Sequence, residues 1–241
     1  LDATCSHTNV TLNGGSDGTA SVVASGGTAP YVYEWNTGAT TTGISGLTAG
    51  TYTVTVTDKN GCTAVCNSTI QEPACNLSAS ATVGTNDVLC NGGSNGTATA
   101  TAIGNTGAVT YLWSNGETTQ SISGLTAGTY TVTVTETPTC TAVASYTVTE
   151  PALLDATCSH TNVTLNGGSD GTASVVASGG TSPYTYLWSN GGTTASISGL
   201  PAGTYTVTVT DTNGCTAACS QTVQEPGCLP TKCIPIGIVK N

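Results

Sequence analysis

The stretch that decides the fold is residues 46–57, Gly-Leu-Thr-Ala-Gly-Thr-Tyr-Thr-Val-Thr-Val-Thr. In its second half Tyr52, Val54 and Val56 alternate with threonines. Because successive side chains of a β-strand point to opposite faces, this alternation predicts a strand with one buried and one solvent-facing side. Threonine suits the solvent-facing side because it is β-branched and tolerates water. The chain is therefore expected to be built of half-buried strands.

This stretch recurs, and other motifs recur with it. It returns at 124–135 and, as Gly-Leu-Pro-Ala-Gly-Thr-Tyr-Thr-Val-Thr-Val-Thr, at 199–210. Residues 1–28 are repeated without change at 154–181, and each copy of the pattern closes with Glu-Pro. Self-similarity at a fixed period indicates tandem repeats. We predict repeats 1, 2 and 3 and a tail, at residues 1–73, 74–151, 152–226 and 227–241.

Turn-forming residues separate the strands within each repeat. Asn13-Gly14-Gly15 and Asn60-Gly61 are examples in repeat 1. Six or seven short strands in roughly 75 residues, with turns at intervals of about 8–12 residues, are typical of a small β-sandwich. The fold class expected is all-β, with three tandem β-sandwich repeats.

Two aromatic positions narrow the type of sandwich. Leu47 lies five residues before Tyr52, and this spacing resembles the tyrosine corner of immunoglobulin and fibronectin type III domains. Each repeat also has one tryptophan where such folds bury a central aromatic ring. A tryptophan that stacks on sugar is the alternative, but tyrosines on the same face favour a core position. The predicted core residues are Trp35, Trp113, Trp188, Tyr52, Tyr130 and Tyr205.

Composition excludes several functions. The chain has 3 Lys+Arg against 13 Asp+Glu and a formal charge of −10, so it lacks the basic face that nucleic acid binding needs. No apolar run approaches the roughly 18–20 residues that span a bilayer. Eleven cysteines without a Cys-x-x-Cys motif favour disulfides over zinc, and disulfides indicate an oxidising compartment. We expect a mature secreted protein, or a segment of one.

Cysteine spacing suggests a pairing but does not determine it. In repeat 2, Cys90 and Cys140 both flank strand ends, so we predict a bond between them. Four cysteines each in and just after repeats 1 and 3 allow three connectivities per set. The favoured set is Cys5–Cys62, Cys158–Cys215, Cys66–Cys75 and Cys219–Cys228, which leaves Cys233 unpaired within the chain. The alternative of Cys5–Cys66 with Cys62–Cys75 remains open.

Chemistry beyond disulfides has little support in the residue pattern. The carboxylates fall at repeated turn and junction positions, whereas a glycosidase needs two that face each other in a cleft. We expect no enzyme activity and no cofactor. Calcium is the one metal considered, because Asp17 and Asp170 lie in Asn-Gly-Gly-Ser-Asp-Gly loops rich in oxygen ligands. Repeat 2 has Asn95 at this position, and an Asx turn explains the same residues.

Several motifs together resemble a known family. Asn-Gly-Gly-Ser-Asp-Gly-Thr-Ala-Ser-Val at 13–22, the segment at 26–35 and the closing Gln-Glu-Pro are similar to the SprB-type repeat. Such repeats occur in very large surface proteins of gliding and other Bacteroidota and are related to polycystic-kidney-disease and other immunoglobulin-like modules. The resemblance implies secretion, with the type IX route expected, and a place in long adhesins or surface filaments. Leu12 and Leu165 depart from the family pattern, where repeat 2 has Cys90.

The leading hypothesis for function is structural: a stalk segment of a bacterial cell-surface adhesin or extracellular filament. One alternative is a carbohydrate-binding or spacer module of a secreted multidomain enzyme. Another is a filament subunit that polymerises by strand exchange through the tail, where isoleucines alternate. The expected partners are neighbouring repeats of the same or another copy, with surface glycans and the secretion or motility machinery as further candidates.

Overall fold

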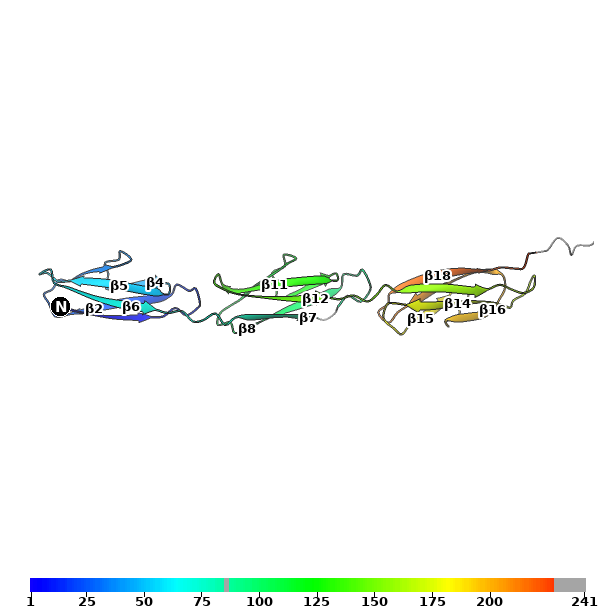
Figure 1. Ribbon diagram of the computed structural model, residues 1–241, viewed down its shortest axis with the longest axis horizontal. Helices are drawn as coiled ribbons and strands as arrows, with labels where there is room; N and C mark the ends of the chain where they lie inside the picture. The colour runs from blue at the N-terminus through cyan, green and yellow to red at the C-terminus, as the bar shows by residue number, and fades with distance from the viewer. Residues whose placement is uncertain (85–86, 228–241) are drawn as a thin grey trace, which may run out of the picture. The chain divides into compact units, whose positions relative to one another are not determined.

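The computed structural model describes residues 1–84 and 87–227. Every regular element in these residues is a β-strand, eighteen in all (Figure 1). The strands form six three-stranded sheets, and each repeat contributes two of them. The all-β sandwich fold expected from the alternation is therefore confirmed.

Repeat 1 contains six strands in two sheets. The first sheet has the order β1-β2-β4 and the second β3-β5-β6, and neighbouring strands are antiparallel. The long pairing of β5 with β6 runs from Gly50 opposite Ile70 to Thr57 opposite Thr63. The strands are β1 Asp2–Thr8, β2 Gly18–Ser25, β3 Val32–Trp35, β4 Gly43–Leu47, β5 Gly50–Thr57 and β6 Thr63–Ile70.

Repeats 2 and 3 repeat this strand plan. Their sheets have the orders β10-β8-β7 and β12-β11-β9 in repeat 2, and β13-β14-β16 and β15-β17-β18 in repeat 3. The strands of repeat 2 are β7 Ser78–Val83, β8 Gly96–Ile103, β9 Thr110–Trp113, β10 Ser121–Leu125, β11 Gly128–Thr137 and β12 Cys140–Val148. Those of repeat 3 are β13 Asp155–Thr161, β14 Gly171–Ser178, β15 Thr185–Trp188, β16 Ser196–Leu200, β17 Gly203–Thr210 and β18 Thr216–Val223.

The core follows the alternation of the sequence. Val54 and Val56 of β5 are fully buried, and Thr55 between them is more exposed. All three tryptophans are 2% exposed, and the Trp35 indole N–H donates to the carbonyl of Thr41 at 2.8 Å. Because a buried indole needs a partner for its N–H, this bond accounts for the fixed place of the ring. The tryptophans are core residues, as predicted.

The tyrosine corner also forms. The Tyr52 hydroxyl donates to the carbonyl of Thr48 at 3.1 Å, and the Tyr205 hydroxyl to that of Pro201 at 3.0 Å. Tyr52, Tyr130 and Tyr205 are half-buried at the edge of the core, whereas the tryptophans lie within it. The bond ties the start of β5 and of β17 to the turn before each strand.

A disulfide joins the two sheets in repeats 1 and 3. Cys5 of β1 bonds to Cys66 of β6, and Cys158 of β13 bonds to Cys219 of β18. The predictions of Cys5–Cys62 and Cys158–Cys215 are therefore wrong. Cys62 lies on the turn before β6, whereas Cys66 lies inside the strand, where its Cα is 5.8 Å from that of Cys5. Bond geometry requires such a distance, so position within the strand decides the pair.

Contacts divide the described chain into two compact units. The first contains Leu1–Gly84, Ala98–Ile122 and Thr129–Thr147. The second contains the described residues within Thr85–Thr97, Ser123–Gly128 and Val148–Asn241. Each unit thus includes a neighbour of repeat 2 together with the part of repeat 2 that contacts it. The repeat boundaries themselves stay a prediction from the sequence.

No helix in the described residues is long and apolar enough to span a membrane.

Candidate functional site: the loops and turns at the repeat junctions

The Asn-Gly-Gly loop after β1 is held by the Glu-Pro motif that closes repeat 1. The Gly14 N–H donates to the Glu72 carboxylate at 2.7 Å, and the Asn13 amide donates to the carbonyl of Pro73 at 3.0 Å. Repeat 2 has the same contacts from Gly92 to Glu150, at 2.7 Å. The recurring glutamate before proline therefore holds the loop in place by accepting a backbone N–H from it.

The calcium candidates Asp17 and Asp170 stabilise this loop in repeats 1 and 3, respectively. Asp17 accepts the backbone N–H of Thr11 at 3.0 Å and its hydroxyl at 2.6 Å, and Asp170 is bonded in the same way to Thr164. The Thr11 hydroxyl, followed by the Thr11 N–H, lowers the pKa of Asp17. Within the described residues no three His, Cys, Asp or Glu side chains gather as a metal site. Calcium binding at Asp17 and Asp170 stays a prediction.

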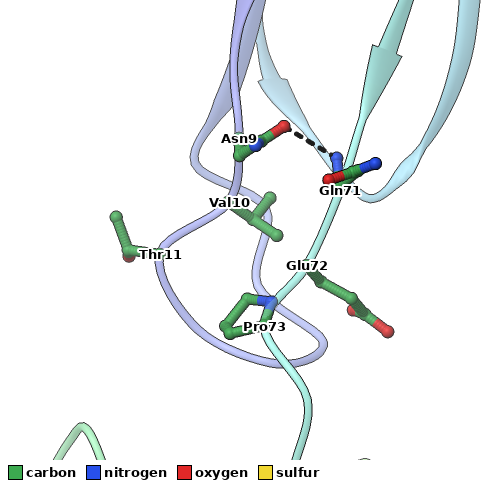
Figure 2. Close-up of a pocket in the computed structure, with 6 residues that line it drawn as sticks. All are labelled: Asn9, Val10, Thr11, Gln71, Glu72 and Pro73. Carbon is green, nitrogen blue, oxygen red and sulfur yellow. Dashed lines mark hydrogen bonds between the residues drawn. The ribbon is translucent and has the colours of Figure 1, made fainter.

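A hollow of about 310 Å³ lies beside this loop in repeat 1 (Figure 2). Figure 2 shows Asn9 and Gln71 facing each other, with the Gln71 N–H donating to the Asn9 side-chain oxygen at 2.9 Å. Thr11 and Glu72 also line the hollow, and their side chains make the hydrogen bonds to Asp17 and Gly14 described above. The polar groups around it thus hold the loop in place.

The turn before the last strand of repeats 1 and 3 is built around one aspartate. Asp58 is 6% exposed, and its carboxylate accepts backbone N–H groups of Thr28, Asn60 and Cys62 at 2.9–3.0 Å. The Thr28 N–H is the main cause of the lowered pKa of Asp58, and burial opposes it. For Asp211 burial is the largest single influence and raises the pKa. Hydrogen bonds from four backbone N–H groups together lower it by more, so the pKa of Asp211 also lies below its ordinary value. The carboxylates are thus fixed acceptors of the turn.

Replacement of Asp58 by Asn is expected to lower the melting temperature of repeat 1 by several degrees at pH 7. The side-chain NH2 of asparagine would face a backbone N–H that the Asp58 carboxylate now accepts, so that hydrogen bond would be lost. The folded pKa of Asp58 lies below its ordinary value of 3.8, so its contribution is present above that value and is lost as the pH falls through the folded pKa.

The difference between wild type and D58N should therefore shrink as the pH falls from about 4 to about 2. Thermal unfolding followed by circular dichroism across that range measures it. Asp2→Asn is the matched control, because Asp2 is an exposed carboxylate of the same repeat. An undiminished difference at the acidic end would contradict the assignment.

The junction between repeats 1 and 2 combines a disulfide with loop contacts. Cys75, two residues after Pro73, bonds to Cys140 at the start of β12. The Thr139 hydroxyl donates to the Asn13 side-chain oxygen at 2.9 Å. Gly14 has φ +69°, and a Cβ there would collide with the Thr139 hydroxyl, so glycine is required by both conformation and space. The loop of repeat 1 thus rests on the last turn of repeat 2.

The junction between repeats 2 and 3 uses a different cysteine. Cys90, in the loop after β7, bonds to Cys215, in the turn before β18, across a sequence separation of 125. The Asn213 amide donates to the carbonyl of Leu89 at 3.0 Å. A hollow of about 280 Å³ lies beside this bond and is lined by Cys90, Asn91, Leu153, Leu154, Gly214, Cys215 and Thr216. This disulfide thus links repeat 2 to repeat 3 by a second covalent connection besides the backbone.

These junction bonds correct the remaining predicted pairs. Cys90–Cys140 is wrong because each of these cysteines faces a different neighbouring segment. Cys66–Cys75 and Cys219–Cys228 are wrong because Cys66 and Cys219 form the disulfides that join the two sheets of their repeats. In the alternative set, Cys5–Cys66 forms but Cys62–Cys75 does not, and Cys62 is a free, exposed thiol. Cys233 and the predicted tail strand lie outside the described residues.

One sequence signal could have pointed to the junction bonds. Cys62, Cys140 and Cys215 each lie four residues after the acidic residue of the same turn. Cys66 and Cys219 recur in repeats 1 and 3, but repeat 2 has Ala144 at that place. The turn cysteine is thus common to all three repeats, whereas the strand cysteine is not, so the two positions serve different bonds.

Solved structures similar to the chain include immunoglobulin-like and adhesin proteins. A structure of the tetra-tandem repeat in the extending region of a large adhesion protein has 18% identity and a TM-score of 0.25, with 92% of this chain and 74% of that chain covered. A structure concerning host cell surface retention of a 1.5-MDa bacterial ice-binding adhesin has 15% identity and a TM-score of 0.35, with 86% and 89% covered. A Dscam structure has 13% identity and a TM-score of 0.28, with 94% and 73% covered.

These structural similarities are too loose to carry an argument about function, and no curated protein matches the chain in sequence. The family comparison is more specific. The model of the SprB repeat matches residues 4–40, 82–118 and 157–193, once within each predicted repeat. Each match runs from the first strand of a repeat past its buried tryptophan. The chain therefore contains three tandem segments that match the SprB repeat, as its recurring motifs indicate.

Proposed function

We propose that the chain is a load-bearing stalk segment of a bacterial cell-surface adhesin. The observation that carries the proposal is the series of disulfides at the junctions. Cys75–Cys140 fastens the segment that leaves repeat 1, and Cys90–Cys215 fastens repeat 2 to repeat 3. Because these bonds lie where consecutive repeats meet, tension along the chain passes through covalent links rather than through loop contacts alone.

The surface fits a supporting role better than a catalytic one. The carboxylates with shifted pKa values accept hydrogen bonds from their own loop or turn or from another loop of the same repeat, where they stabilise backbone conformation. A catalytic carboxylate would instead need to face a substrate. The tryptophans, at 2% exposed, present no ring face for a sugar to stack on, which weighs against the carbohydrate-binding alternative.

Location outside the cell is part of the same proposal. Four disulfides within the described residues require an oxidising compartment. The SprB repeat supports placement at the cell surface. Export by the type IX route and a contribution to attachment or gliding are the finer parts of the proposal.

Surface labelling tests the proposal. Antibodies raised against the folded chain should label intact, unpermeabilised cells of the source bacterium, and mild protease treatment of whole cells should remove the signal. A periplasmic protein serves as the control and should be labelled only after permeabilisation. Labelling confined to permeabilised cells would refute the surface role. Binding of the purified chain to a glycan array, lost in a surface variant with an unchanged melting temperature, would favour the carbohydrate-binding alternative instead.

A further inference from the structure

Repeat 1 carries a turn that is built like the disulfide-bonded turn of repeat 3. The turn Asp58–Cys62 has the sequence Asp-Lys-Asn-Gly-Cys, and the turn Asp211–Cys215 has Asp-Thr-Asn-Gly-Cys. In both, the aspartate accepts the backbone N–H groups of the asparagine and the cysteine, each at 2.9 Å. The asparagine amide donates to a threonine hydroxyl at 3.0 Å in both, Thr28 in repeat 1 and Thr181 in repeat 3. The two turns therefore share one preformed framework.

The turn of repeat 3 is occupied by the loop of the preceding repeat. Cys215 bonds to Cys90 with a Cα–Cα distance of 5.7 Å, and the Asn213 amide also donates to the carbonyl of Leu89. In repeat 1, Cys62 is free and exposed. The cysteine at this position is bonded in both other repeats, in each case to a cysteine that precedes it in the chain. Cys62 is thus the exception among equivalent cysteines.

The side chains of the turn distinguish two kinds of incoming loop. Repeat 2 has Glu136-Thr-Pro-Thr-Cys140, in which proline replaces the asparagine. That turn receives the Cys-less loop of repeat 1: the Thr139 hydroxyl donates to the Asn13 side-chain oxygen, and the disulfide comes from Cys75 instead. The Asp-x-Asn-Gly-Cys turn of repeat 3 receives the loop that contains the cysteine, and its asparagine amide donates to the loop carbonyl, which proline at this position could not do. Turn sequence and loop sequence are matched at both junctions.

We propose that the turn 58–62 is a receiving site for a Leu-Cys-Asn-Gly-Gly loop of a preceding SprB repeat, and that Cys62 forms a disulfide with the cysteine of that loop. The sulfur–sulfur bond forms as two S–H bonds break. The two electrons and two protons pass to a disulfide oxidant such as oxidised glutathione, which becomes two thiols. The partner that this surface fits is a repeat of the second type, which has the loop sequence of residues 89–93.

A single substitution tests whether the repeat 1 turn can receive this loop. Thr212→Lys in the full chain converts the turn of repeat 3 into the sequence of repeat 1, at an exposed residue. After oxidative refolding with glutathione, non-reducing peptide mass spectrometry should find Cys90 bonded to Cys215 in the same fraction of molecules as in the wild type. A free Cys215 in T212K, with Cys158–Cys219 intact, would overturn the proposal.

An extended chain tests the site itself. Residues 74–153 are placed before Leu1 of the full chain, which reproduces the natural connection into repeat 3, because Leu154-Asp155 has the sequence of Leu1-Asp2. Cys62 should then be alkylated by iodoacetamide at least tenfold more slowly than in the original chain. Its disulfide peptide should contain Cys90 of the added copy.

The matched control is the same extended chain with Cys90→Ser in the added copy only. Cys62 should regain the alkylation rate of the original chain, while Cys75–Cys140 of the added copy reports that the added repeat is folded. A bond from Cys62 to any other cysteine in the extended chain, or unchanged alkylation with that reporter bond formed, would overturn the proposal. If the added repeat does not form its reporter bond, the T212K result decides.

Discussion

Pulled between Leu1 and Asn241, the oxidised chain is expected to extend to no more than about 200 Å, whereas the reduced chain should reach about 840 Å, at about 3.5 Å per residue. With disulfides intact, a covalent path runs through residues 1–5, 66–90 and 215–241, about 57 residues. All other residues lie inside loops that the bonds close, so unfolding them adds no length. Single-molecule force spectroscopy with and without reductant measures the difference.

The two junction bonds should act in parallel. Without Cys90–Cys215, a second path through Cys75–Cys140 and Cys158–Cys219 also has about 57 residues, so C90S/C215S should leave the limit unchanged. Removing Cys75–Cys140 as well should lengthen the path to about 121 residues, or about 420 Å at the same rise per residue. An increase in length from the first variant alone, without reductant, would contradict this connectivity.

Replacement of Trp113 by Ala is expected to cost repeat 2 about 3–5 kcal/mol of its free energy of unfolding, the range for deletion of a large buried aromatic side chain. The ring is 2% exposed, and its N–H donates to the carbonyl of Thr119 at 2.9 Å. The substitution therefore leaves both a cavity and an unpartnered carbonyl. Domains of this size are only marginally stable, so such a loss should populate unfolded repeat 2.

Hydrogen exchange of peptides from β8 to β12, compared at increasing urea, measures this effect for repeat 2 alone. Leu112→Ala is the matched control, because Leu112 is the preceding residue on β9, points to the other face and is 57% exposed. It should change the free energy of unfolding by less than about 0.5 kcal/mol. Equal effects of the two substitutions would mean that the tryptophan is not a core residue of the sandwich.

The strand pattern and the core followed from the sequence because they depend on local periodicity. Alternation in Thr51–Thr57 specifies which side chains enter the core, and the same rule holds at each repetition of the stretch. The spacing of Tyr52 and Leu47 likewise predicted a corner whose hydroxyl bond is local, four residues upstream. The sequence predicted that the Glu-Pro motifs close the repeats, but it did not predict the hydrogen bonds from the glutamates to the loop 58 residues away.

What the sequence alone determined is the type of element, the number of repeats and the residues of the core, since each rests on patterns a few residues long or on their recurrence. Only the tertiary structure decided the disulfides. Cys62 and Cys66 are four residues apart and equally suited by spacing, yet one lies in a turn and the other within a strand against β1. A disulfide forms only where two Cα atoms come within about 7 Å. That proximity depends on how sheets and neighbouring repeats pack, so the recurring turn cysteine indicates that two kinds of bond exist but not which cysteines meet.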